Sequence, residues 1–170
     1  VGPTGAGESV LLATLAAQFL RYPEAQVYLF DKGRSARAIL LGLGGDFFDL
    51  GEEDALGLQP FERIHEPEER AWALDWIAGL IAAANVSVTP EMRAELWRTL
   101  EILSARPVED RTLTLYVALA QDGEVRAALQ PFTHAGPYGR LLDHDRSTLG
   151  YGAVQAFEMD DLMRRPQAAG

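Results

Sequence analysis

The sequence contains no cysteine and a single lysine, Lys32, among its 170 residues. Without cysteine there is no disulfide framework, no thiolate metal site and no cysteine nucleophile. Long apolar runs are lacking too. Even the stretch 72–88 carries Asp75 and Asn85, whereas a membrane-spanning helix needs about 20 apolar residues. We therefore expect a cytoplasmic protein that reaches a membrane only through partners.

Positive charge is scarce: the sequence has 15 basic and 25 acidic residues, which gives a formal net charge of −10. Non-specific nucleic-acid binding depends mainly on Lys and Arg that neutralise phosphates. Nucleic acid is therefore a possible partner that the composition does not indicate. With 48% hydrophobic and 24% charged residues, the chain has the composition of a folded globular protein.

The two ends of the sequence have the features of an internal segment. The first residue is Val1 rather than Met, and no signal-peptide leader precedes Gly2. Residues 164–170 follow a predicted helix start without a closing element. We expect the chain to be a fragment of a longer protein.

Residues 1–66 alternate between helical and strand patterns. A glycine-rich turn over 2–9 precedes an apolar helix over 10–20, and strands over 25–31 and 46–50 flank a short helix over 35–41. This alternation predicts an α/β sheet.

Residues 67–130 are predicted to form an all-helical insertion. Pro67 begins a helix that places Trp72 and Trp76 on its core face, and Thr89-Pro90 begins a second helix. Thr114 and Asp122 are the expected caps of two further short helices. Residues 131–170 are predicted to return to the sheet, with short strands at 141–142 and 153–157.

The segment Gly2-Pro3-Thr4-Gly5-Ala6-Gly7-Glu8-Ser9 fits the phosphate-loop pattern G-x-x-x-x-G-K-[ST] at every fixed position except the lysine. In such a loop, successive backbone N–H groups surround a phosphate, and the next helix adds its dipole. We expect ATP to bind here and the Ser9 hydroxyl to ligate Mg²⁺. The candidate nucleotide-binding residues are Pro3, Thr4, Gly5, Ala6, Gly7, Glu8, Ser9 and Val10.

Glu8 occupies the position of the phosphate-loop lysine. A charge contact at about 4 Å is worth roughly 4 kcal/mol at an effective dielectric constant near 20. Replacing attraction by repulsion predicts weak ATP binding and little or no hydrolysis, so no catalytic residue is assigned. A sequence error, a deliberate inactivating change and a natural degenerate copy are alternative origins of Glu8.

Other candidate ligands are few. Asp31 follows a predicted strand and is either a second Mg²⁺ ligand or a turn residue. The three histidines, His65, His134 and His144, lack the spacing of a metal site, and we assign them no metal.

Several separated segments, taken in order, resemble the VirB4 and TrbE type ATPases of conjugal transfer and type IV secretion, with TrbE the closer match. The phosphate loop alone is shared with many nucleotidases, whereas the segments Phe30–Ser35 and Gly136–Asp143 together are much more specific. The segments are residues 2–9, Phe30–Ser35, Leu43–Phe47, Gly57–Phe61, Arg111–Leu113, Gly136–Asp143 and Ala156–Met159.

The resemblance implies an incomplete RecA-like P-loop NTPase core with a helical insertion. It also implies homo-oligomers, hexamers in this family, which work with other type IV secretion components at the cytoplasmic side of a bacterial inner membrane. ATP hydrolysis would energise the channel. The acidic Walker B strand and the arginine finger of the family lie beyond this sequence, and residues 153–161 resemble an earlier strand and helix cap.

Two alternatives stay open. Glu8 favours a non-hydrolysing P-loop subunit that builds the assembly, while retention of Gly5, Gly7 and Ser9 disfavours it. The other is a DNA-translocating ATPase of the FtsK and HerA kind, whose phosphate loop is similar.

Overall fold

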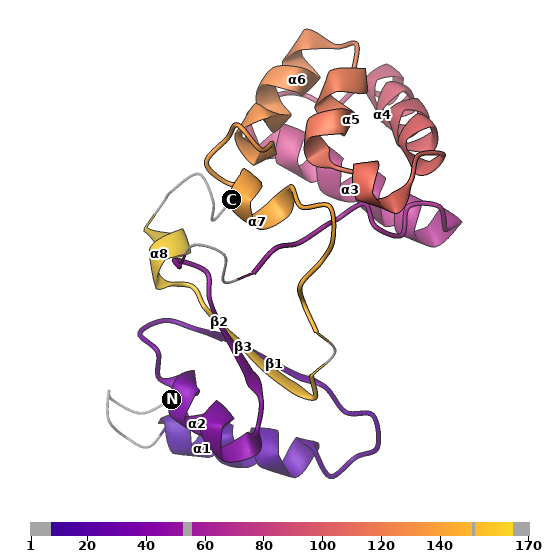
Figure 1. The fold of residues 1–170 in the computed structure, drawn as a ribbon. Coiled ribbons are helices and arrows are strands. Elements are labelled where there is room, and N and C mark those ends of the chain that lie inside the picture. The colour runs from indigo at the N-terminus through magenta and orange to yellow at the C-terminus, as the bar shows by residue number, and fades with distance from the viewer. Residues whose placement is uncertain (1–7, 53–55, 151, 165–170) are drawn as a thin grey trace. The chain divides into compact units, whose positions relative to one another are not determined.

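A computed structural model describes residues 8–52, 56–150 and 152–164 (Figure 1). The chain divides into two compact units. A sheet unit comprises residues 1–55 and 150–170, and a helical unit comprises residues 56–149. The predicted insertion, residues 67–130, lies inside the helical unit, which extends further at both ends.

The sheet unit contains three parallel strands, β1 (Val27–Asp31), β2 (Asp46–Asp49) and β3 (Val154–Glu158). Their order is β1-β3-β2, so the strand most distant in sequence lies in the middle (Figure 1). The register aligns Asp31 with Glu158 and Glu158 with Asp49. All three strands therefore end on an acidic residue at one edge of the sheet.

Two helices, α1 (Glu8–Phe19) and α2 (Ala36–Leu43), lie next to each other in the sheet unit (Figure 1), and the short helix α8 (Asp160–Met163) follows β3. The core on this side joins Leu40 of α2 to Val154 and Ala156 of β3. Helices combined with parallel strands agree with the predicted α/β class.

The two faces of the sheet differ because side chains alternate along a strand. Glu158, the last residue of β3, is an even number of positions from Val154 and Ala156, so its side chain lies on the same face of the sheet as theirs, the face covered by α2. On the opposite face, Phe157 stacks between Phe30 and Phe48, with ring centroids 5.3 and 5.4 Å apart.

The helical unit packs four main helices around one core. They are α3 (Pro67–Ala83), α4 (Pro90–Ser104), α5 (Leu113–Leu119) and α6 (Gly123–Leu129), with short 3₁₀ turns at Val108–Asp110 and Gln130–Phe132 and a last helix α7 (Gly139–Leu142). Helices α4 and α6 begin at the caps that the sequence predicts. The Thr89 hydroxyl accepts from Met92 N–H, and the Asp122 carboxylate accepts from Glu124 and Val125 N–H, as predicted.

Two local predictions in this unit were wrong. The cap of α5 is Thr112, whose hydroxyl accepts from Leu115 N–H, whereas the predicted cap Thr114 bonds through its side chain to Asp143. Residues 141–142 belong to α7, not to a strand. Two apolar residues are too few to establish a period, and the tertiary contacts of Gly139 decide the conformation.

The core face of α3 is also shifted from the predicted one. The buried positions include Ala73, Ile77 and Ile81, spaced by four residues. Trp72 is 52% exposed, and it stacks on the half-buried Trp76 with ring centroids 5.9 Å apart. The smaller residues occupy the side where helices pack closely, and the large indole of Trp72 stays at the surface.

No helix in the described part of the chain is long and apolar enough to cross a membrane.

Candidate functional site

The predicted phosphate loop leads directly into α1. Pro3, Thr4, Gly5, Ala6 and Gly7 lie outside the described residues. Glu8 and Ser9 are the first two residues of α1, and Val10 follows them with 69% of its surface exposed. The predicted apolar helix is therefore present, and it begins at Glu8, two residues before the predicted start at Val10.

The start of α1 lies at the carboxyl edge of the sheet. Residues 20–26 connect α1 to β1, and a cleft of about 410 Å³ between them is lined by Leu12 and Phe19 of α1 together with Val27 and Leu29 of β1. A helix that packs on a strand after so short a connection runs antiparallel to it. Ligands of open α/β sheets bind at the carboxyl ends of the strands, so the first turn of α1 lies on the side of the sheet where a ligand is expected.

A tight turn follows β1 at this edge. The Asp31 Oδ1 atom accepts from the Lys32 N–H at 2.8 Å and from the Ser35 hydroxyl at 2.7 Å. Gly33 and Arg34 both have positive φ angles, +94° and +60°, which is uncommon for a residue with a side chain. This arrangement gives Asp31 the turn role, one of the two predicted for it, and its role as a Mg²⁺ ligand stays a prediction.

The carboxylate of Glu158 holds the same turn from the neighbouring strand. Glu158 is only 2% exposed. It accepts backbone N–H groups from Gly33 at 3.1 Å, from Arg34, and from Asp160 at 2.9 Å. One buried carboxylate therefore joins the turn after β1 to the start of α8.

Arg34 extends this network to β2. Its guanidinium donates to the Asp49 carboxylate at 2.7 Å, and Asp49 also accepts from the Gly51 N–H at 3.1 Å. The pocket at this edge has a volume of about 420 Å³. It is lined by Gly33, Arg34, Asp49, Gly51, Glu52, Glu158, Asp160 and Asp161.

Sequence reasoning did not single out Glu158 or Asp49 as site residues. The available signal was that each strand of the sheet ends on an acidic residue, followed by a glycine or a helix start. The family-like segments Phe30–Ser35 and Ala156–Met159, noted separately along the chain, meet here through the carboxylate of Glu158.

In the helical unit, the family-like segment Gly136–Asp143 serves packing. A Cβ atom on Gly139 would lie 2.0 Å from the carbonyl oxygen of Thr133. The Asp143 carboxylate accepts the backbone N–H groups of Thr114 and His134. These packing and hydrogen-bond contacts account for the glycine and the aspartate of this segment without a bound ligand.

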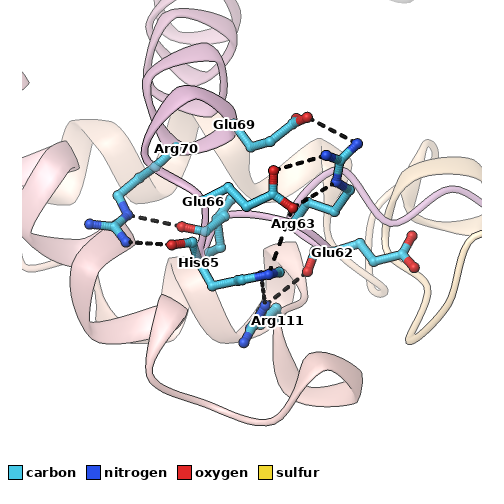
Figure 2. Close-up of polar contacts among 8 residues, drawn as sticks. Glu62, Arg63, His65, Glu66, Glu69, Arg70 and Arg111 are labelled. Atoms are coloured by element: carbon cyan, nitrogen blue, oxygen red, sulfur yellow. Dashed lines mark hydrogen bonds and ion pairs between the residues drawn. The ribbon is translucent and has the colours of Figure 1, made fainter.

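A second polar cluster in the helical unit surrounds Arg111 (Figure 2). Arg111 is 7% exposed; its guanidinium donates to the Glu62 carbonyl oxygen at 2.8 Å and contacts His65 Nδ1 at 3.1 Å. On the other side of this segment, Arg70 donates to the carbonyl oxygens of Ile64 and His65. The two arginines fix the backbone that leads into α3.

Metal ligation does not account for this cluster. The Nδ1 atom of His65 faces a guanidinium, and no group of three or more His, Cys, Asp or Glu side chains among the described residues is arranged to hold a metal ion.

Known proteins resemble this chain over most of its length. The chain is 38% identical over 167 residues to a probable conjugal transfer protein TrbE of Sinorhizobium fredii (strain NBRC 101917 / NGR234), a match that covers 95% of this chain and 25% of the relative. It is 37% identical over 169 residues to the conjugal transfer protein TrbE of Rhizobium radiobacter, again over 95% of this chain and 20% of the relative. The chain is a relative of the TrbE and VirB4 proteins.

More distant matches agree with this relationship. A type IV secretion system protein virB4 of Bartonella henselae (strain ATCC 49882 / DSM 28221 / CCUG 30454 / Houston 1) is 24% identical over 176 residues, which cover 97% of this chain and 22% of the relative. The solved structure of VirB4 of Thermoanaerobacter pseudethanolicus superimposes with a TM-score of 0.69 at 14% identity, over 96% of this chain and 50% of that one. No protein-family model matches the chain.

The resemblance predicted from the sequence is thereby confirmed, with TrbE as the closer of the two named types. The chain spans about a quarter or less of the length of these curated relatives. At 14% identity, the solved VirB4 structure is informative about the fold alone.

Proposed function

We propose that this chain is a nucleotide-binding segment of a type IV secretion or conjugal DNA transfer motor, with a RecA-like core. Residues 3–10 would hold the phosphates of ATP, and Ser9, together with Asp31, would approach the Mg²⁺ ion. The observation that carries the proposal is the position of α1, which begins at Glu8 and points its first turn toward the carboxyl edge of a parallel sheet. Backbone N–H groups at a helix start favour a phosphate.

The described part of this site would favour a bound nucleotide, and one residue of the sequence opposes it. The first turn of α1 and the acidic strand ends suit a phosphate accompanied by a divalent cation, whose charge offsets the carboxylates. Glu8 adds a negative charge where the family pattern has a lysine. Bound Mg·ATP would supply the phosphoryl-transfer chemistry, and this chain would contribute binding and orientation.

The direct test is ATP binding to the chain and to its Glu8→Lys variant, measured by isothermal titration calorimetry with Mg²⁺ present. We expect Glu8→Lys to bind at least about 100-fold more tightly, because roughly 4 kcal/mol of charge contact changes sign and solvent screening removes only part of it. Glu24→Lys, which makes the same charge change in the loop between α1 and β1, is the control and should bind like the parent chain. Failure of Glu8→Lys to bind ATP would contradict the proposal.

Glu8 also favours a second function, that of a P-loop subunit that builds the assembly without turning over ATP. The two functions differ in the chain as it stands, since a structural subunit would bind its neighbours whether or not ATP is present. Assembly would follow the family expectation of a homo-oligomer, a hexamer, with other secretion components at the inner membrane. Sedimentation of the parent chain with and without Mg·ATP separates the two functions.

A further inference from the structure

The turn after β1 contains an anion-binding arrangement that the protein fills with its own carboxylate. Gly33 and Arg34 have consecutive left-handed conformations, and both N–H groups donate to Glu158. Successive backbone N–H groups of a turn that converge on one group form a nest for an anion. The carboxylate at the end of β3 occupies that nest and also accepts from the Asp160 N–H.

This contact determines the conformation of the turn. Arg34 is a residue with a side chain at a φ angle of +60°, a conformation that persists where the surroundings impose it. Here the surroundings are the Glu158 carboxylate on the backbone and the Asp49 carboxylate on the guanidinium. Both carboxylates are buried, with 2% and 8% of their surfaces exposed.

The same turn also fixes Asp31. The Ser35 hydroxyl at the end of the turn donates to Asp31 Oδ1 at 2.7 Å. Asp31 is paired with Glu158 in the strand register and lies at the sheet edge where α1 begins. Displacing the turn would therefore displace the carboxylate that we propose to approach Mg²⁺.

We propose that Glu158 is a positioning residue of the nucleotide site, which acts through the Gly33-Arg34 nest and Ser35 to orient Asp31 toward the metal side of Mg·ATP. The inference rests on the proposed function. It assigns different roles to two acidic residues at the carboxyl edge of the sheet. Glu158, on the central strand, binds the protein backbone, whereas Asp31, on β1, would face the ligand.

The test uses the Glu8→Lys chain, so that ATP affinity is measurable. Glu158→Gln keeps the side-chain shape but replaces one accepting oxygen by an NH₂ group, which cannot accept from the nest. Gln155→Leu is the matched control. It changes a fully buried polar residue at the other end of β3, whose side chain donates to the Gly150 carbonyl oxygen. ATP dissociation constants are measured with Mg²⁺ and with EDTA, and thermal midpoints for every variant.

We expect Glu158→Gln to weaken ATP binding about tenfold with Mg²⁺, because a displaced Asp31 would lose about one charge-assisted contact on the metal side, and to weaken it much less with EDTA. Gln155→Leu should lower the thermal midpoint without this Mg²⁺-dependent loss. Equal losses with Mg²⁺ and with EDTA, or the same loss in Gln155→Leu, would show a purely structural role and overturn the proposal.

A second variant keeps the test decisive if Glu158→Gln fails to fold. Ser35→Ala cuts the link to Asp31 at an exposed position, and we expect the same Mg²⁺-dependent weakening. An unchanged affinity in Ser35→Ala would overturn the proposal in that case. If Glu8→Lys alone does not bind ATP, the proposed function fails and this inference fails with it, whereas ATP binding that is indifferent to Glu158 and Ser35 refutes the positioning role alone.

Discussion

The sheet unit and the helical unit differ in how much of their apolar surface is buried. The helical unit encloses one large core, in which Ile77, Leu100, Leu103 and Tyr116 are fully buried. In the sheet unit the buried cluster consists of Leu40, Val154 and Ala156. Ten of the thirteen large hydrophobic side chains that are exposed among the described residues belong to the sheet unit: Val10, Leu11, Leu12, Leu15, Phe19, Tyr22, Tyr28, Phe30, Leu41 and Met163.

The family-like segments differ between the units in the same way. In the helical unit, Arg111 and Asp143 bond mainly to backbone groups nearby, and Gly139 permits a close backbone approach. In the sheet unit, the segments around Arg34 and Glu158 converge on the edge where a ligand would bind. The segments that resemble the family therefore serve two different purposes. Those in the helical unit maintain packing, and those in the sheet unit form the candidate site.

The largest expected effect tests where the stability lies. Leu100→Ala in the helical core should lower the free energy of unfolding by about 3 kcal/mol, because a fully buried leucine leaves a cavity. Leu15→Ala on α1, where Leu15 is 56% exposed, should change it by less than about 0.5 kcal/mol. Urea unfolding followed by circular dichroism measures both. If Leu15→Ala is as costly as Leu100→Ala, the apolar surface of the sheet unit is buried in solution, and the contrast between the units disappears.

A smaller effect tests the packing role of the family-like glycines. Gly139→Ala should cost about 2 kcal/mol, since its Cβ atom would collide with the Thr133 carbonyl group, a backbone that cannot move aside cheaply. Gly79→Ala is the control inside α3. Nothing lies within 4 Å of its added Cβ, so it should stabilise the unit by up to about 1 kcal/mol. Thermal midpoints of the two variants should therefore move in opposite directions, and a tolerated Gly139→Ala would remove the packing explanation.

Sequence reasoning performed best where local chemistry decides the structure. The alternation of helix and strand, the apolar helix that became α1, and the caps Thr89 and Asp122 all depend on neighbouring residues, and the structure bears them out. It was wrong where tertiary contacts decide. Thr112 rather than Thr114 caps α5 because Asp143 engages the Thr114 side chain, and Trp72 is exposed because smaller residues fill the helix interface.

The edge network of the sheet could not have been derived from the sequence. Asp31, Asp49 and Glu158 are separated by up to 127 positions, and only the strand order β1-β3-β2 and its register bring them together. Glu158 falls just past the strand predicted over 153–157, in a segment noted for its family resemblance and not for a role at the site. The phosphate-loop residues themselves stay a prediction, since residues 3–7 lie outside the described part of the chain.

The smallest expected effect is a pH dependence of the helical unit. At the start of α3, the side-chain hydrogen bond from Arg63 holds the pKa of Glu66 below its ordinary value. Because the unfolded chain then binds more protons than the folded one, this contribution is complete above the ordinary glutamate pKa of about 4.3 and is lost as the pH falls through the lowered folded pKa. All three tryptophans, Trp72, Trp76 and Trp97, lie in this unit, so urea unfolding followed by tryptophan fluorescence between pH 6 and pH 3 reports on it selectively. Glu66→Gln should flatten the slope in that window, whereas the neighbouring exposed Glu68→Gln should retain it. Identical slopes for Glu66→Gln and the parent chain would show that the Arg63 contact does not stabilise the fold, since a half-exposed ion pair in water can be too weak to measure.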